Sequence, residues 1–200
     1  IIWGYVMKIA LLMTGFPRTY STTYRNLKKN ILDSHEVDIY ICSWDKCQLR
    51  SGYPHIHADI ESVLKTYSDR LVDYKFFDFD NYCENRFESI EFLSRKNDVF
   101  KIDPRAIEHG TYWVERLRDQ WFIVKNAFSL IHNKSSYDMI MRIRFDVDLY
   151  EIDIKNYEFV IPKDIGGWRY SDHFAYGNLS CMEKYCNVFD HIQDLYYTNN

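Results

Sequence analysis

The feature that most constrains the fold is a nearly unbroken apolar run near the start of the chain, from Met7 to Met13. A strand exposed on one face alternates apolar and polar residues, whereas a strand covered on both faces is apolar throughout. The run therefore predicts a buried strand of a parallel sheet. It ends at Thr14-Gly15-Phe16-Pro17-Arg18, where Gly15 permits a tight turn and Pro17 stops strand pairing.

The elements after this strand alternate between helix and strand, as in βαβ units. The expected elements are a helix at 20–31, a strand at 37–44, a short helix at 60–67 capped by Asp59, and a strand at 70–79. A strong amphipathic helix is expected next at 113–131, then strands at 137–150 and 159–162, and a last helix opened by a capping box, Ser180-x-x-Glu183. Residues 84–112 are charged and irregular, which indicates an insertion or loop. We expect an α/β fold of GT-A (Rossmann-like) type, with a central, mostly parallel sheet flanked by helices.

Composition bounds the architecture and excludes some partners. With 200 residues, 46% of them apolar, the chain is long enough for one sizeable core and short for two, so we expect a single domain over 1–200. A net charge of −4 argues against general binding to nucleic acid or acidic membranes. The sequence has no run of about 18 apolar residues for a membrane span. Ile1 is no initiator and Met7 precedes the first strand, so residues 1–6 are expected to be a leader or cloning remnant.

The five cysteines are odd in number and form no Cys-x-x-Cys pair. Reduced thiols and a cytoplasmic location fit this pattern. His55-x-His57 with Asp59 is another cluster of metal-ligating side chain types, and because it lies beside Pro54 a loop is the preferred interpretation.

The strand at 137–150 carries the chemistry, because its apolar pattern runs into two carboxylates. One face carries Met139, Met141, Ile143, Phe145 and Val147, and the other carries Arg142, Arg144, Asp146 and Asp148. Two strand carboxylates at i and i+2 lie about 7 Å apart at Cα, so their oxygens can converge on one divalent cation. Arginines beside them suit phosphate. The alternative is a solvated face on which the charges of two arginines and two aspartates cancel one another.

A second Asp-x-Asp, Asp78-Phe79-Asp80, competes for the metal role at the end of the 70–79 strand. Its surroundings are polar and lack an arginine, which favours a loop. Trp44 ends another strand and is either a core residue or a stacking surface for a base.

The glycine- and aromatic-rich segment 166–177 is typical of a lid or acceptor pocket. Within it, Asp172 with His173 would act as a base or contact a hydroxyl, and Trp168 and Tyr170 would stack on a sugar ring. The alternative is a turn with an exposed aspartate.

Four stretches match a known family in order and spacing: 11–20, 37–44, 137–148, and 172–177 followed by Met182. They resemble the GT-A type nucleotide-sugar glycosyltransferases of bacterial surface-polysaccharide clusters and large DNA viruses. The most specific part is the strand Arg142-x-Arg144-x-Asp146 paired with the later Asp172-x-Phe174-x-x-Gly177. The resemblance covers roughly residues 8 to 195.

The resemblance implies a transferase that moves a sugar from a UDP-sugar to a hydroxyl of a glycan or glycoprotein. The residues implied for the nucleotide sugar are Thr14, Gly15, Arg18, Trp44, Arg142 and Asp146. Mn²⁺ or Mg²⁺ would bridge Asp146, Asp148 and the pyrophosphate, and Arg144 and Asp172 would be catalytic. Many relatives keep the first aspartate, here Asp146, and vary the position of Asp148. A monomer is expected, in the host-cell cytoplasm if virus-encoded, and compatible with being one part of a longer multidomain chain.

Three alternatives share part of this pattern. A haloacid-dehalogenase-like phosphatase places its Asp-x-Asp early and follows it with threonine, unlike Asp146-Val147-Asp148 here. A nucleotidyltransferase acting on sugar phosphates would want a glycine-rich loop after the first strand, and 14–18 has a single glycine. A non-catalytic carbohydrate-binding module with a structural ion stays open, because sequence alone does not separate it from a transferase.

Overall fold

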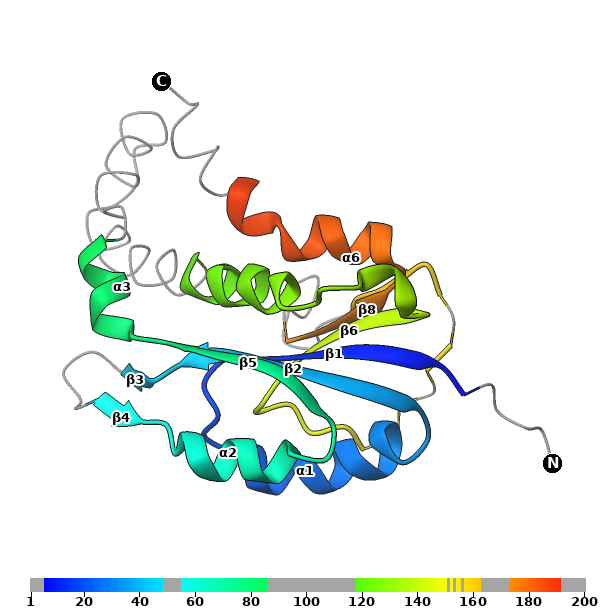
Figure 1. Ribbon diagram of the computed structural model, residues 1–200, viewed down its shortest axis with the longest axis horizontal. Coiled ribbons are helices and arrows are strands. Elements are labelled where there is room, and N and C mark those ends of the chain that lie inside the picture. Colours follow the sequence, from blue (N-terminus) through cyan, green and yellow to red (C-terminus); the bar gives the residue numbers. More distant parts are fainter. Residues whose placement is uncertain are drawn as a thin grey trace.

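The structure is a computed structural model that describes residues 6–48, 55–85, 118–150, 152, 154–155, 157–162 and 173–191 (Figure 1). Most of the predicted insertion at 84–112 lies outside these residues, as does most of the predicted lid. The predicted site residues Trp168, Tyr170 and Asp172 therefore lie outside the described part of the chain.

A mostly parallel, six-stranded sheet forms the centre of the described residues, in the order β5-β2-β1-β6-β8-β7. Its strands are β1 (Lys8–Thr14), β2 (Glu36–Trp44), β5 (Leu71–Phe77), β6 (Met139–Arg144), β7 (Phe159–Val160) and β8 (Phe174–Gly177). The first four are mutually parallel, and β8 runs antiparallel to both β6 and β7. The α/β prediction is confirmed, and so is the edge position of the strand before Pro162. A separate hairpin pairs β3 (Lys46–Gln48) with β4 (His55–His57).

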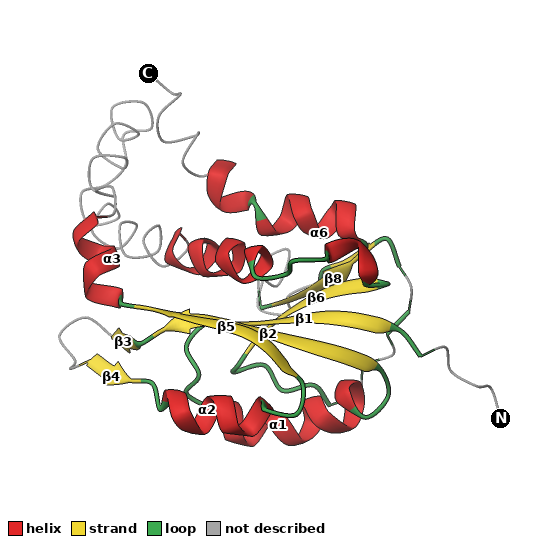
Figure 2. Ribbon diagram, in the orientation of Figure 1, coloured by secondary structure: helices red, strands yellow, loops and turns green. Residues whose placement is uncertain are grey.

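Helices cover both faces of the sheet, as the apolar first strand predicts (Figure 2). One face packs against α1 (Tyr20–Leu27), its π-helical continuation η1 (Lys28–Leu32) and α2 (Ile60–Tyr67). The other packs against the helical segment 118–129 and α6 (Leu179–Cys186). The short helices α3 (Phe79–Asn85) and η2 (Lys134–Ser136) complete the described elements. Alternate β1 side chains enter the two cores: Ile9 and Leu11 on one side, Ala10 and Leu12 on the other.

The chain reverses its direction across the sheet at β1. From β1 it passes through α1 to β2 and through α2 to β5, moving outward with both helices on one face. It then returns through segment 118–129, on the opposite face, to β6 on the other side of β1. In open α/β sheets such a switch point leaves a crevice at the carboxyl ends of the two strands, where ligands bind. Here those ends are Thr14 and Arg144, which are paired in register.

The strand predicted over 137–150 is shorter than expected and ends at Arg144. Its neighbours run out at that point, because β1 ends at Thr14 and β8 begins at Phe174, opposite Ile143. The chain then turns, and the Val147 N–H donates to the Arg144 carbonyl oxygen at 3.1 Å. Asp146 and Asp148 are therefore turn and loop residues, and strand alternation does not decide where their side chains lie.

At the helix N-termini, the structure confirms one predicted cap and corrects two other expectations. The Asp59 side chain accepts from the Ser62 N–H at 3.1 Å, as predicted for α2. The predicted capping box at Ser180 is wrong, because the Asn178 side chain caps α6 by accepting from the Cys181 N–H at 2.9 Å. The segment after Asp78 was expected to be a loop but forms α3, and Asp78 accepts from the Asn81 N–H at 3.0 Å. In each case an Asx side chain satisfies a free amide of the first turn.

Gly177, the last residue of the predicted Asp172-x-Phe174-x-x-Gly177 pattern, lies where two strands approach closely. A Cβ there would lie 2.4 Å from the Glu158 carbonyl oxygen. The same oxygen accepts from the Asn178 N–H at 3.0 Å, which ties the end of β8 to the residue before β7. A larger residue at position 177 would clash with the backbone at Glu158, so the close approach of the two segments requires glycine.

Candidate functional site

Two arginines and one aspartate meet at the switch point. Arg18, from the loop after β1, donates from Nη2 to Asp146 Oδ2 at 3.1 Å. Arg144, the last residue of β6, donates from Nε to Oδ1 at 2.8 Å and from Nη2 to Oδ2 at 2.6 Å. The Arg144 pair is bidentate, a geometry that fixes the guanidinium plane. The three predicted residues are thus brought together from segments more than 120 positions apart.

The loop after β1 directs Arg18 toward β6. Gly15 has a φ of +84°, a left-handed conformation that other residues adopt at a cost. A Cβ there would lie 3.6 Å from Arg144 Cγ, an ordinary contact, so backbone conformation rather than space requires the glycine. Its carbonyl oxygen accepts from Ser43 Oγ at 2.7 Å, and the Arg18 N–H donates to the Phe16 carbonyl oxygen at 2.9 Å. The loop is therefore anchored to β2 while it turns back over the sheet.

The cluster carries two positive charges and one negative charge. Burial by itself would raise the pKa of the Asp146 carboxyl, but the hydrogen bonds and charge of Arg144, followed by those of Arg18, hold that pKa below its ordinary value. Asp146 is therefore ionised at neutral pH, and the three side chains together have a net charge of +1. The Arg18 side chain is 44% exposed and that of Arg144 21% exposed, so solvent reaches both side chains.

Arg142, two residues before Arg144 on β6, has different surroundings from the cluster. The side chain is fully buried, and its Nε donates to Thr14 Oγ1 at 2.9 Å. Arg142 was predicted to share the functional face of the strand with Arg144, but it is buried, because segment 118–129 and α6 cover that side of the sheet. Thr14, also fully buried, links the ends of β1 and β6 through this bond instead of facing a ligand.

Trp44 lies in an aromatic cluster of the core, the first of the two alternatives that the sequence left open. It is 6% exposed, and its ring stacks on Phe122 with a centroid distance of 5.6 Å and an interplanar angle of 11°. Phe79 meets it edge-on at 5.3 Å. Its indole is therefore covered and packs against neighbouring rings where a base would have to stack.

Asp148 has different partners from Asp146. Its Oδ1 accepts from Asn26 Nδ2 of α1 at 2.7 Å, and its carboxylate also accepts from the Tyr150 hydroxyl. That hydrogen bond, and then the carboxylate charge, raise the pKa of Tyr150. The two aspartates predicted to share a cation are therefore engaged by separate groups.

Whether these carboxylates suit Mn²⁺ or Mg²⁺ depends on which aspartate is considered. Such ions take hard oxygen ligands, and Mg²⁺ often uses only one or two carboxylates together with substrate phosphates. Asp146 is the candidate for this role, since it is next to the arginines that would hold a phosphate and its carboxylate has about four lone-pair sites for three hydrogen bonds. Asp148 is held instead by Asn26 of α1 and by Tyr150, so we assign it no role in cation binding. Among the described residues, no group of three or more His, Cys, Asp or Glu side chains gathers as a cation site.

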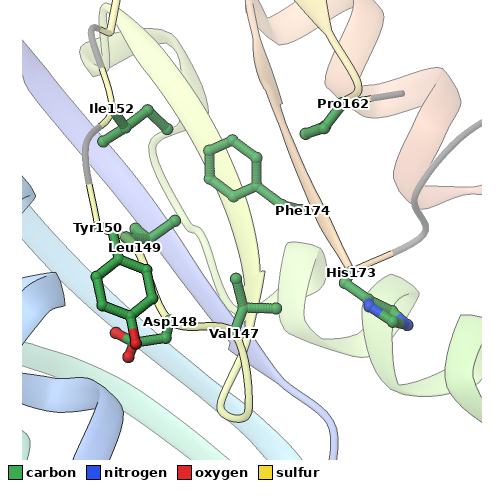
Figure 3. Close-up of a pocket in the computed structure, with 8 residues that line it drawn as sticks. All are labelled: Val147, Asp148, Leu149, Tyr150, Ile152, Pro162, His173 and Phe174. Carbon is green, nitrogen blue, oxygen red and sulfur yellow. The ribbon is translucent and has the colours of Figure 1, made fainter. Parts of the chain in front are cut away.

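A cleft of about 360 Å³ opens beside the cluster (Figure 3). Its lining residues are Val147, Asp148, Leu149, Tyr150, Ile152, Pro162, His173 and Phe174. The backbone N–H of Arg144 donates to the His173 carbonyl oxygen at 3.0 Å, so the cleft and the arginine cluster share a wall.

Two residues that hold the loop after Asp146, one in α1 and one in η1, were not predicted from the sequence. Asn26 binds Asp148, and Asn30 Nδ2 donates to the carbonyl oxygens of Leu149 at 2.5 Å and Tyr150 at 2.9 Å. They are four positions apart on a helical surface, so they lie on the same side. The sequence signal that could have identified them is a pair of asparagines at this spacing, next to the apolar positions of the 20–31 helix.

No helix within the described ranges is long and apolar enough to cross a membrane. In comparisons with protein-family models, curated proteins and solved structures, no match to the chain was found.

Proposed function

We propose that the protein is a glycosyltransferase that binds a UDP-sugar at the switch-point crevice and transfers the sugar to a hydroxyl of a glycan or glycoprotein. The observation that carries the proposal is the pair of partly exposed arginine side chains, Arg18 and Arg144, held by one carboxylate at the carboxyl ends of β1 and β6. This is where open α/β sheets bind nucleotides, and guanidinium groups match phosphate oxygens.

The charges of the reaction fit this site. The bond between the sugar C1 and the β-phosphate oxygen breaks, and C1 bonds to the acceptor oxygen, whose proton passes to a base. The leaving diphosphate gains negative charge as the bond breaks, and Arg18 and Arg144 are suited to stabilise it. Asp146 orients both guanidinium groups before the donor arrives. Asp172, outside the described residues, stays the predicted base or hydroxyl-orienting group.

A divalent cation is part of the proposal through Asp146. When bound, Mn²⁺ or Mg²⁺ would add positive charge at the diphosphate. Asp146 is the protein ligand that we assign to it. We do not assign Asp148 as a ligand.

UDP titration calorimetry tests the donor site. We expect Arg18→Ala to weaken UDP binding about 10-fold or more, since a hydrogen bond to a charged group contributes roughly 1.5–3 kcal/mol. Arg144→Lys keeps the charge but loses the bidentate geometry, and a smaller loss is expected. Arg25→Ala is the matched control, because Arg25 is an exposed arginine on α1. UDP affinity unchanged in Arg18→Ala would contradict the proposal.

Product analysis separates the alternatives. A glycosyltransferase releases UDP from a UDP-sugar when an acceptor is present. A nucleotidyltransferase would instead release pyrophosphate from UTP and a sugar 1-phosphate. A carbohydrate-binding module would bind glycans and show no UDP affinity that depends on Arg18.

A further inference from the structure

The cleft lined by Val147 to Tyr150, Ile152, Pro162, His173 and Phe174 is a second site beside the arginine cluster. We propose that it binds the acceptor as a pyranose ring, with Asp148 taking a hydrogen bond from a ring hydroxyl. The proposal rests on the proposed function and adds to it the place and chemical class of the acceptor. It also gives Asp148 a role other than metal binding.

The lining of the cleft matches the two kinds of surface on a sugar ring. Its floor is apolar, with Phe174 and Leu149 nearly covered at 5% and 8% exposed. Figure 3 shows Phe174 in the middle, Asp148 and Tyr150 together on one side, and His173 on the opposite side. A pyranose has C–H groups on its ring faces, which pack on aromatic and aliphatic side chains, and hydroxyls around its rim. The polar groups of the cleft lie where such a rim would be.

The size of the cleft fits a small ligand. Ligand pockets have volumes of about 300–1,000 Å³, and this cleft of about 360 Å³ is near the lower limit. Tyr150 is 73% exposed, so its ring is available as a further stacking surface at the entrance.

The polar side of the cleft is held in place from α1 and η1. Asn26 binds the Asp148 carboxylate, and Asn30 binds the carbonyl oxygens of Leu149 and Tyr150. These bonds fix a loop that lies beyond the last strand pairing of β6. A carboxylate of two oxygens keeps acceptor capacity beyond its bonds to Asn26 and Tyr150, because it has about four lone-pair sites.

The position of the cleft connects it to the donor site. Asp148 follows Asp146 by two residues, and His173 shares a backbone hydrogen bond with Arg144. A sugar ring in the cleft would thus lie next to the crevice in which the donor diphosphate is proposed to bind. Transfer requires this adjacency, since the reacting atoms must approach within about 3–3.5 Å.

Methyl NMR of the full chain tests the site without any turnover. The probes are methyl α-glycosides of glucose, galactose and mannose, added at millimolar concentration in the presence and absence of UDP. We expect at least one to shift the methyl signals of Val147, Leu149 and Ile152. The methyls of Val72, 53% exposed on the outer strand β5, are the internal control and should not shift.

Variants then identify the role of Asp148. We expect Asp148→Ala to weaken the methyl-glycoside response about 10-fold while UDP affinity in Mn²⁺ changes less than 2-fold. Asp33→Ala is the matched control, because Asp33 is an exposed carboxylate that pairs with Lys28 at the end of η1. A loss of UDP affinity in Mn²⁺ with an unchanged glycoside response would overturn the proposal and return Asp148 to the metal site.

The two proposals fail separately. Glycoside shifts without UDP binding would retain a sugar site and reject the transferase. UDP binding with no shift of the cleft methyls by any probe, with or without UDP, would overturn the acceptor site and leave the donor site standing.

Discussion

The chain contains two Asp-x-Asp sequences, each just after a parallel strand, and they have different surroundings. Asp146 follows β6 and lies between two guanidinium groups with its side chain 22% exposed. Asp78 and Asp80 follow β5. Asp78 caps α3, and Asp80, 57% exposed, pairs with Lys46 and lies 4.0 Å from His55 Nδ1. The same three-residue pattern thus orients arginines in one place and stabilises a helix start and a surface ion pair in the other.

Strand order explains the difference. β6 lies beside β1 at the switch point, where two strand ends and the loop carrying Arg18 converge. β5 is the outer strand of the described sheet and pairs with β2 alone. The chain just after β2 supplies Lys46, which pairs with Asp80, and Asp45, which accepts from the Phe79 N–H. A motif therefore indicates a candidate site, and its place in the sheet decides whether other functional groups reach it.

The largest difference is expected in turnover. Asp146→Asn should reduce UDP-sugar turnover roughly 100-fold or more, because a misplaced catalytic group costs on that order and both arginines lose the carboxylate that orients them. Asp78→Asn should leave turnover within about 2-fold. UDP release assays on both variants make the comparison, with circular dichroism as the folding control. If Asp78→Asn were the more damaging change, the site would belong to the other Asp-x-Asp.

The dependence of UDP affinity on metal should also differ between the two Asp-x-Asp sequences. We expect UDP to bind more tightly in Mn²⁺ than in EDTA, because a cation held by Asp146 would add positive charge at the diphosphate. Asp146→Asn should remove that difference, whereas Asp80→Asn should keep it. Calorimetric titration in both buffers measures the effect. Equal wild-type affinities in the two buffers would remove the metal from the mechanism.

Stability should depend on pH through Asp146. Its pKa is held below the ordinary value of about 3.9, so its contribution is present above that value and is lost as pH falls through the folded-state pKa. We expect Asp146→Asn to lower the free energy of unfolding by about 1 kcal/mol at pH 7. The difference from wild type should shrink as the pH is lowered below that ordinary value. Urea denaturation at neutral and at acidic pH checks this, and a difference that grew on acidification would contradict the ion-pair geometry.

The smallest expected effect comes from replacing Asp78, the aspartate that caps α3. Asp78→Ala should destabilise α3 by about 0.5–1 kcal/mol, since it leaves the Asn81 N–H without its side-chain acceptor. Asp78→Asn keeps an acceptor oxygen and should cost less. Thermal unfolding of the two variants separates capping from charge. UDP affinity should be the same in both, and a change would connect this end of the sheet to the donor site.

Local pattern was enough to predict most of the framework. The apolar run of β1 predicted a doubly covered strand, and the helical spacing at 20–31 predicted α1, because burial on one or two faces leaves its period in the sequence. Asp59 was predicted as a cap because its hydrogen bond spans three residues. Arg18, Arg144 and Asp146 were predicted as neighbours because carboxyl ends of parallel strands meet at one edge.

Features that depend on contacts between residues far apart in the sequence were decided only by the tertiary structure. β6 stops at Arg144 because β1 and β8 no longer flank it, and no local pattern records where a partner strand ends. Arg142 is buried because segment 118–129 and α6 cover its face. Asp148 accepts a hydrogen bond from Asn26, 122 positions away, whereas Asp146 pairs with the two arginines. Sequence alone determined which residues carry charge and which elements they follow. Packing between elements far apart in the chain determined which of those charges meet.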